Sequence, residues 1–104
     1  MNWFKNLFYK KSKEAWVKVK KITQETSDMK VFYLEKNSYV KNFKPGQFVS
    51  VGMKINGNLE RRSYSLVSPS EENQISFMVK KIENGLVSNW LHNNIKEGDS
   101  LLLG

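Results

Sequence analysis

The residues best suited to chemistry in this sequence stand together in one short segment, Glu60-Arg61-Arg62-Ser63-Tyr64-Ser65. On a strand, side chains two residues apart share a face, so Arg62 and Tyr64 should point one way while Ser63 and Ser65 point the other. A guanidinium, an aromatic plane and a hydroxyl group suit an extended planar ligand with a phosphate tail. An ordinary exposed strand face is the competing interpretation, and this segment alone leaves both open.

Several other kinds of site are excluded by the residue types present. The chain has no cysteine, which removes disulfides, thiolate-bound zinc, iron–sulfur clusters and a cysteine nucleophile. His92 is the only histidine, so we expect no metal site, and we expect His92 itself to lie on the surface without a chemical role. The sequence contains neither a Gly-x-Ser-x-Gly elbow nor a Walker-type loop. Redox chemistry would therefore need an added cofactor.

Most of the chain has the period-two pattern of strands with one buried face. Strands are predicted from Ala15 onward and over residues 31–34, 47–53, 59–67, 75–79 and 101–103. Residues 24–28 and 68–73 are polar and predict turns. Asn56-Gly57 predicts a tight type I′ hairpin turn, because both residues tolerate positive φ. These strands must position the Arg62 segment, which lies on the fourth of them.

A change of period after Asn84-Gly85 predicts one helix. Its apolar stripe is formed by Leu86, Val87, Trp90, Leu91 and Ile95. Gly98 is expected to end this helix before the last strand. Six strands with one short helix after the fifth indicate a mainly β fold, a six-stranded antiparallel Greek-key β-barrel, since closure removes exposed strand edges. With 104 residues, we expect one such domain over residues 15–104.

We expect residues 1–14 to be a basic amphipathic extension to this domain. Seven lysines and one glutamate give residues 1–21 a charge of +6 out of the total of +7, so the rest of the chain is nearly neutral. Trp3, Phe4, Leu7 and Phe8 would form one apolar stripe on an N-terminal helix. Two interpretations stay open, a weak membrane-surface or protein contact by residues 3–13 and an extension that packs back on the barrel. No segment is apolar enough for a signal-peptide core or a membrane span, and a cytoplasmic protein is expected.

Four ordered segments carry a resemblance to a known family. Arg62-Ser63-Tyr64-Ser65-Leu66 resembles the Arg-x-Tyr-Ser/Thr flavin motif of the ferredoxin reductase superfamily, and residues 44–49 resemble the Pro-Gly-Gln-Phe strand entry that precedes it. Val79-Lys80-Lys81 with residues 85–91 is similar to the family's Val-Lys-Arg and Gly-x-x-Ser-x-x-Leu segments. Residues 97–99 are similar to its Gly-Asp turn. The resemblance covers residues 15–104, in the family's order and spacing.

The resemblance implies FAD as the cofactor, in preference to FMN, and a role for each matching residue. Tyr64 would pack on the isoalloxazine, Ser65 would place its hydroxyl near flavin N5, and these two would serve catalysis. Arg62 would pair with the pyrophosphate, with Ser63 beside it in the motif. Gly85, Val87 and Ser88 would present the start of the helix to the same phosphates, although Ser88 as a mere helix cap is the competing interpretation. Val79 and Lys80 would run beside the cofactor.

The implied function is the FAD-binding domain of an oxidoreductase that passes electrons between NAD(P)H and an acceptor, such as ferredoxin or another redox protein partner. Family members continue into a doubly wound nucleotide-binding domain, and no Gly-x-Gly-x-x-Gly segment occurs here. We therefore expect the nicotinamide site on another stretch of polypeptide, either because this chain is a fragment, which we favour, or because a separate subunit supplies that site.

Two alternatives of other classes remain at this point. An OB-type nucleic-acid-binding barrel would also have short strands and exposed aromatic residues. Its groove should be positively charged, whereas the excess charge here lies on the extension and first strand, so we expect no nucleic-acid partner. A docking module without a cofactor is the second alternative.

Overall fold

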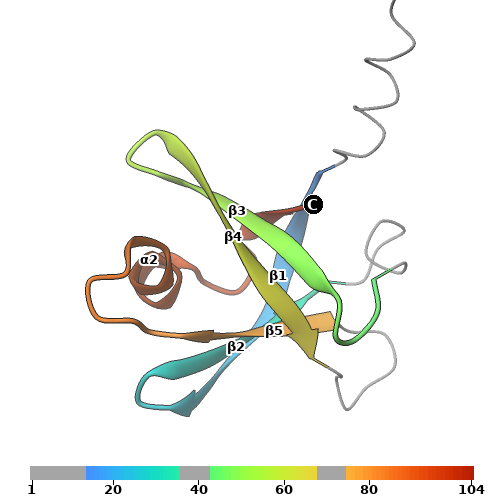
Figure 1. The fold of residues 1–104 in the computed structure, drawn as a ribbon, viewed down its shortest axis with the longest axis horizontal. Coiled ribbons are helices and arrows are strands. Elements are labelled where there is room, and N and C mark those ends of the chain that lie inside the picture. Colours follow the sequence, from blue (N-terminus) through green and yellow to red (C-terminus); the bar gives the residue numbers. More distant parts are fainter. Residues whose placement is uncertain (1–13, 36–42, 68–74) are drawn as a thin grey trace, which may run out of the picture.

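The fold was described from a computed structural model, which places residues 14–35, 43–67 and 75–104 (Figure 1). The predicted N-terminal helix, nearly all of the basic extension and the turn predicted at residues 68–73 lie outside the described residues. Among the residues described, no helix is long and apolar enough to cross a membrane.

Six strands form a closed barrel, which confirms the predicted fold class. The strands are β1 (Ala15–Thr26), β2 (Met29–Leu34), β3 (Phe48–Ile55), β4 (Asn58–Val67), β5 (Ile75–Lys80) and β6 (Ser100–Leu103). Their order around the barrel is β1-β2-β5-β4-β3-β6, and every neighbouring pair is antiparallel. The predicted helix is present as α2 (Leu86–Asn94), after β5.

Alternating apolar residues fill the barrel as the sequence pattern predicts. Val17 and Val19 of β1 are buried, and so are Ile75, Phe77 and Val79 of β5. Such β-branched and aromatic residues suit a pleated, half-buried surface. The rings of Phe32 and Phe77 stack at the centre with their centroids 5.4 Å apart.

Several predicted boundaries differ from the observed ones, and the two largest differences, at the ends of β1 and α2, involve polar segments. β1 continues to Thr26, where the sequence predicted a turn from residue 24, because backbone pairing with β2 persists to Thr26 opposite Met29 while the side chains there face solvent. α2 ends at Asn94, before Gly98. Gly98, with φ of +96°, instead forms the turn that leads into β6, and its N–H donates to the Val19 carbonyl. The hairpin at Asn56 and Gly57 is confirmed by their φ values of +51° and +82°.

The barrel wall opens where β4 separates from β5. β4 pairs with β3 from Asn58 to Ser65, but it pairs with β5 only at Leu66 and Val67. The part of β4 that precedes Leu66 therefore has no neighbour on its β5 side within the described sheet. The chain between β5 and α2 and the helix itself lie across this opening (Figure 1). Val87 and Leu91 of α2 are buried in the barrel core, which fixes the helix at this end of the molecule.

Candidate functional site

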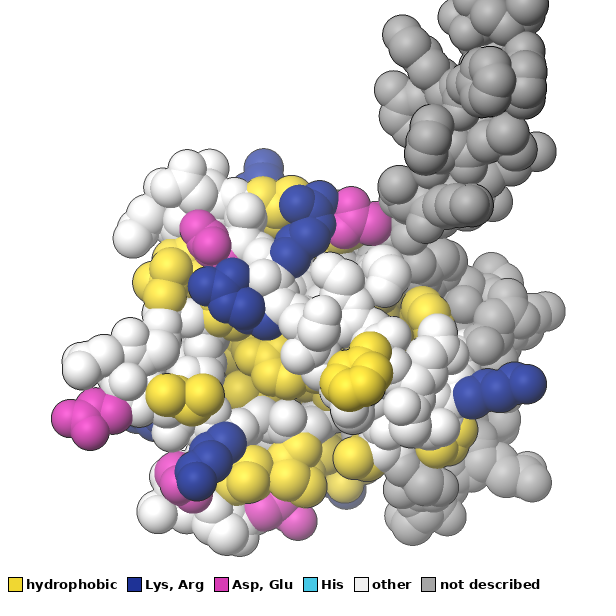
Figure 2. Space-filling model, in the orientation of Figure 1, with side chains coloured by type: hydrophobic (Ala, Val, Ile, Leu, Met, Phe, Trp, Pro, Cys, Tyr) yellow, Lys and Arg dark blue, Asp and Glu magenta, His cyan; other side chains and the backbone are white. Residues whose placement is uncertain are grey.

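A pocket of about 310 Å³ lies in the opening between β4 and α2. Its β4 side is formed by Arg62, Ser63 and Tyr64, and its other side by Ile82 and residues 85–88. In the space-filling view, hydrophobic side chains are visible within a hollow in this region, with Lys or Arg side chains beside them (Figure 2). The sequence segment richest in chemical groups and the start of α2 thus form one site.

Tyr64 supplies a fixed aromatic plane to the pocket. It lies opposite Val49 in the β3–β4 pair and stacks on Phe77, with the ring centroids 5.3 Å apart and the planes 27° apart. Burial raises the pKa of the Tyr64 phenol above its ordinary value of 10.0, and the positive charge of Arg62 opposes this effect. The ring is therefore neutral at physiological pH and anchored to the core.

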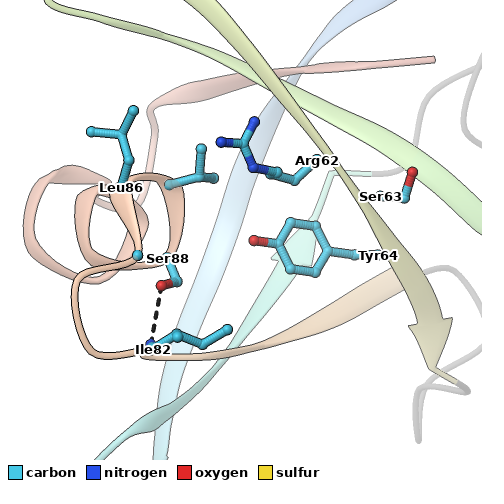
Figure 3. A pocket seen from close by; sticks show the side chains of 8 residues that line it. Arg62, Ser63, Tyr64, Ile82, Leu86 and Ser88 are labelled. Carbon is cyan, nitrogen blue, oxygen red and sulfur yellow. Dashed lines mark hydrogen bonds between the residues drawn. The ribbon is translucent and has the colours of Figure 1, made fainter.

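Arg62 shares the face of Tyr64, as the strand alternation predicts. Its side chain is about half exposed and extends toward α2 (Figure 3). One guanidinium nitrogen donates to the Arg61 carbonyl at 2.7 Å, and the same nitrogen lies 3.6 Å from the Glu60 carboxylate. A guanidinium has five N–H donors, so this arrangement leaves donors for an anion in the pocket.

The start of α2 presents backbone donors to the same pocket. The N-cap residue is Gly85, which has no side chain to accept a bond from the helix, and the first turn contains no acidic residue. The first N–H groups of a helix lack intrahelical partners and carry a partial positive charge. This helix end is therefore suited to a phosphate group.

Close packing around Gly85 holds the loop that leads into the helix. A Cβ atom at position 85 would lie 2.7 Å from Ser88 Oγ and 3.1 Å from the Ile82 carbonyl oxygen. Ser88 Oγ accepts a hydrogen bond from the Ile82 N–H at 3.1 Å (Figure 3), and Asn89 Nδ2 donates to the carbonyls of Ile82 and Gly85. The interpretation of Ser88 as a helix cap is wrong, because the cap position is Gly85. The Ser88 hydroxyl keeps its own proton to donate.

Six of the nine residues predicted from the sequence line this pocket. They are Arg62, Ser63, Tyr64, Gly85, Val87 and Ser88. The Ser63 hydroxyl points away (Figure 3), so Ser63 contributes mainly its backbone. The other three lie elsewhere: Ser65 is exposed on β4 opposite Phe48, Val79 is fully buried in the core, and Lys80 is exposed.

Two pocket residues, Ile82 and Leu86, were missed as site residues. The two residues are 61% and 51% exposed, so neither is held in the core. Ile82 follows a strand in an otherwise polar turn, and this apolar residue beside Gly85 was the available signal. Leu86 was assigned to the buried stripe of the helix, but it is exposed, whereas Val87, Leu91 and Ile95 of that stripe are buried in the core.

The prediction that His92 lies on the surface is wrong. Its side chain is buried, and Nε2 lies 2.7 Å from the Val79 carbonyl oxygen. The reason is the position of α2 at the barrel end, where the last turn packs against β5. A local sequence of polar neighbours gives no indication of this contact.

Comparisons with known proteins agree with this geometry. Residues 16–103 match the model of the oxidoreductase FAD-binding domain family. The chain is 41% identical over 87 residues to the glycine betaine monooxygenase reductase subunit of Pseudomonas aeruginosa, a match that covers 82% of this chain and 24% of that protein. It is 37% identical over 79 residues to a flavohemoprotein of the same species, covering 74% and 20% of the two chains.

A solved structure extends the likeness to three dimensions. The ferredoxin NADP+ reductase from Neisseria gonorrhoeae, crystallised with FAD and NADP, superposes with a TM-score of 0.74 at 25% identity, covering 88% of this chain and 37% of that one. The chain belongs to the oxidoreductase FAD-binding domain family. It is an FAD-binding domain of the kind found in ferredoxin reductases and flavohemoproteins, and the nucleic-acid-binding alternative gains no support. It spans about a quarter of the length of the curated relatives it matches.

The residues of the pocket fit FAD by their chemistry. Tyr64 offers a plane for stacking, while Arg62 and the start of α2 offer donors for a pyrophosphate. The pocket volume is at the lower end of the range of roughly 300–1,000 Å³ for ligand sites. Only part of a dinucleotide would be enclosed there, and the remainder would lie along the surface.

Proposed function

We propose that Tyr64, Arg62 and the start of α2 together hold FAD in this chain. The observation that carries the proposal is that all three reach one pocket, although twenty residues lie between Tyr64 and Gly85 along the chain. Bound FAD would supply the redox chemistry, accepting an electron pair and releasing electrons singly. The protein's part is to bind and orient the cofactor.

Each residue has a separate part in this proposal. Tyr64 would cover one face of the isoalloxazine ring and exclude water from it, because the tyrosine ring is itself held by stacking on Phe77. Arg62 and the amides of residues 86–88 balance the negative charge of the pyrophosphate. Ser65 is proposed for the polar contact near flavin N5 on its motif position alone, because it lies outside the pocket on the face of β4 opposite to Tyr64. Val79 and Lys80 lie outside the pocket, so their proposed contact with the cofactor rests on the motif alone.

For the whole protein, we propose electron transfer between NAD(P)H and a redox protein partner. Support comes from the NADP in the gonococcal reductase structure and from the relative that is the reductase subunit of a monooxygenase. The nicotinamide site would lie on polypeptide outside this chain. A cytoplasmic location stays a prediction.

Titration of the purified domain with FAD tests the binding proposal. FAD fluorescence should be quenched on binding, and Arg62→Ala should raise the Kd about 10- to 100-fold, because a hydrogen bond to a charged group contributes about 1.5–3 kcal/mol. Arg61→Ala is the matched control and should leave the Kd nearly unchanged, since Arg61 pairs with Glu14 instead. Equal losses in the two variants would show that the assigned facing is wrong. Absence of FAD binding by the unmodified domain would refute the function.

The proposed role of Ser65 has its own test. Ser65→Ala should keep the FAD Kd within about threefold, as expected for an exposed substitution. It should shift the visible absorption maximum of bound FAD, because a hydroxyl near N5 polarises the ring. Ser63→Ala, whose hydroxyl points away from the pocket, should leave the spectrum unchanged. Identical spectra for all three proteins would remove Ser65 from the site.

A further inference from the structure

The last turn of α2 is tied to two strands through a compact set of polar contacts. Lys30 on β2 and Val79 on β5 are direct cross-strand partners. The Lys30 ammonium donates to the backbone carbonyl of His92 at 2.7 Å, and His92 Nε2 lies 2.7 Å from the Val79 carbonyl oxygen. A carbonyl oxygen only accepts, so Nε2 carries the proton and donates. We call Lys30, Val79 and His92 the helix brace.

The brace supplies what apolar packing of the helix does not. Val87 and Leu91 bury α2 against the core, but burial is non-directional and allows small sliding or rotation. Two hydrogen bonds at fixed positions on β2 and β5 remove that freedom, and the buried imidazole makes its bond where water cannot replace it. The ammonium also complements the partial negative charge at the end of a helix. The brace therefore fixes both the rotation and the axial position of α2.

The opposite end of this helix reaches the pocket. α2 has nine residues and is about 14 Å long at 1.5 Å per residue, so it moves as one rigid piece. A shift at the brace would displace the amides of residues 86–88 relative to Arg62 across the pocket. Neither Lys30 nor His92 lines the pocket itself.

We propose that Lys30 and His92 are positioning residues for the phosphate-binding end of α2. They hold the helix so that its first N–H groups face the same pyrophosphate as Arg62. This inference rests on the proposed function, in which the start of α2 binds the FAD phosphates. It assigns the buried histidine a purpose in cofactor binding without any contact with the cofactor.

FAD titration of four variants tests the proposal. His92→Ala should raise the FAD Kd about tenfold, which corresponds to about 1.4 kcal/mol. His92→Gln, whose amide can still donate to the Val79 carbonyl, should restore most of the affinity. Lys30→Met, which keeps the length of the side chain without its charge, should raise the Kd by a smaller factor. Val17→Ala is the control, because it opens the core at a β1 residue that neither lines the pocket nor belongs to the helix brace, and it should lower the Tm with little change in Kd.

Hydrogen exchange on the FAD-free protein provides a second measurement. In His92→Ala, amides of residues 86–94 should exchange faster, while those of β1 and β3 should keep their protection. Uniformly faster exchange, a Kd unchanged in His92→Ala, or an equal loss of affinity in Val17→Ala would each overturn the inference. If the unmodified domain binds FAD and His92→Ala binds it equally well, only this inference fails. If the unmodified domain binds none, the proposed function fails and the inference with it.

Discussion

Arg61 and Arg62 are neighbours in the sequence but belong to two different regions of the molecule. On the outer face of β4, Arg61 makes two hydrogen bonds of 2.8 Å with the Glu14 carboxylate and lies over Gly52. On the pocket face, Arg62 extends toward α2 and keeps donors for a ligand (Figure 3). The outer face thus fastens the residue that precedes β1, whereas the pocket face is left available for binding.

Strand geometry accounts for the difference between these two regions. Successive side chains of a strand point to opposite faces, and Arg62 and Tyr64 share the inward face with Val51 and Val49. An inward arginine would normally be buried. β4 pairs with β5 only at Leu66 and Val67, however, so the barrel wall is open beside Arg62 and Tyr64. The binding region is therefore a part of the barrel interior that strand separation exposes. Substitutions on the two faces should have separable effects.

The largest difference in FAD affinity is expected between two variants of β4. Tyr64→Ala changes the pocket face, and Leu59→Ala removes a half-exposed apolar residue on the outer face. Loss of the stacking plane should raise the FAD Kd about 5- to 150-fold, since stacking on an aromatic side chain contributes about 1–3 kcal/mol. Tyr64→Ala should also lower the Tm, because the ring packs on Phe77. Fluorescence titration and thermal unfolding measure both effects. Equal Kd values for the two variants would contradict the division into faces.

Gly85→Ala should have the next largest effect, and it should lower both the stability of the domain and its affinity for FAD. The added methyl would meet Ser88 Oγ and the Ile82 carbonyl, and such overpacking costs about 1–3 kcal/mol. Moving Ser88 or the loop would also displace the start of α2, so the FAD Kd should rise. Gly98→Ala is the control: it strains a positive φ away from the pocket and should lower only the Tm. A Kd raised equally by both would remove Gly85 from the site.

The titration of Tyr64 gives a smaller, pH-dependent effect. Its folded pKa lies above 10.0, so the neutral phenol is favoured by folding, and this contribution is complete below pH 10 and is lost as the pH rises through the folded pKa. Absorbance at 295 nm should show a tyrosine titrating later than a free phenol, and this component should be missing in Tyr64→Phe. If the component that Tyr64→Phe removes were one that titrates below pH 10, the ring would not be buried.

The smallest effect is expected on the outer face, for Glu14→Gln. The hydrogen bond from Arg61 lowers the pKa of the Glu14 carboxyl below 4.5, so the carboxylate stabilises the fold above that pH and the contribution is lost as the pH falls through the folded pKa. The Tm of Glu14→Gln should be slightly lower than that of the unmodified domain at pH 7 and equal to it in acid, because exposed pairs are weak. FAD affinity should be unchanged. A weaker FAD affinity in this variant would show that the two faces are coupled.

The sequence predicted the strands and the facing of the central motif because both follow from local rules. Period two alone placed Val17, Val19, Ile75 and Phe77 inside the barrel, and it placed Arg62 with Tyr64. Asn56-Gly57 predicted its hairpin because few residues accept positive φ. The errors at Thr26 and Gly98 arose where polar segments continue or end an element through backbone pairing alone.

What the sequence determined by itself was the set of chemical groups and the face of the strand on which each stands. Only the tertiary structure decided that β4 is unpaired with β5 up to Leu66, and this opening turns the inward face of β4 into a pocket. It alone decided that Ile82 and Leu86 border this pocket and that His92 is buried at the far end of α2. The physical reason is that alternation is a property of neighbouring residues, whereas the end of a strand pairing and the docking of a helix depend on segments distant in the chain.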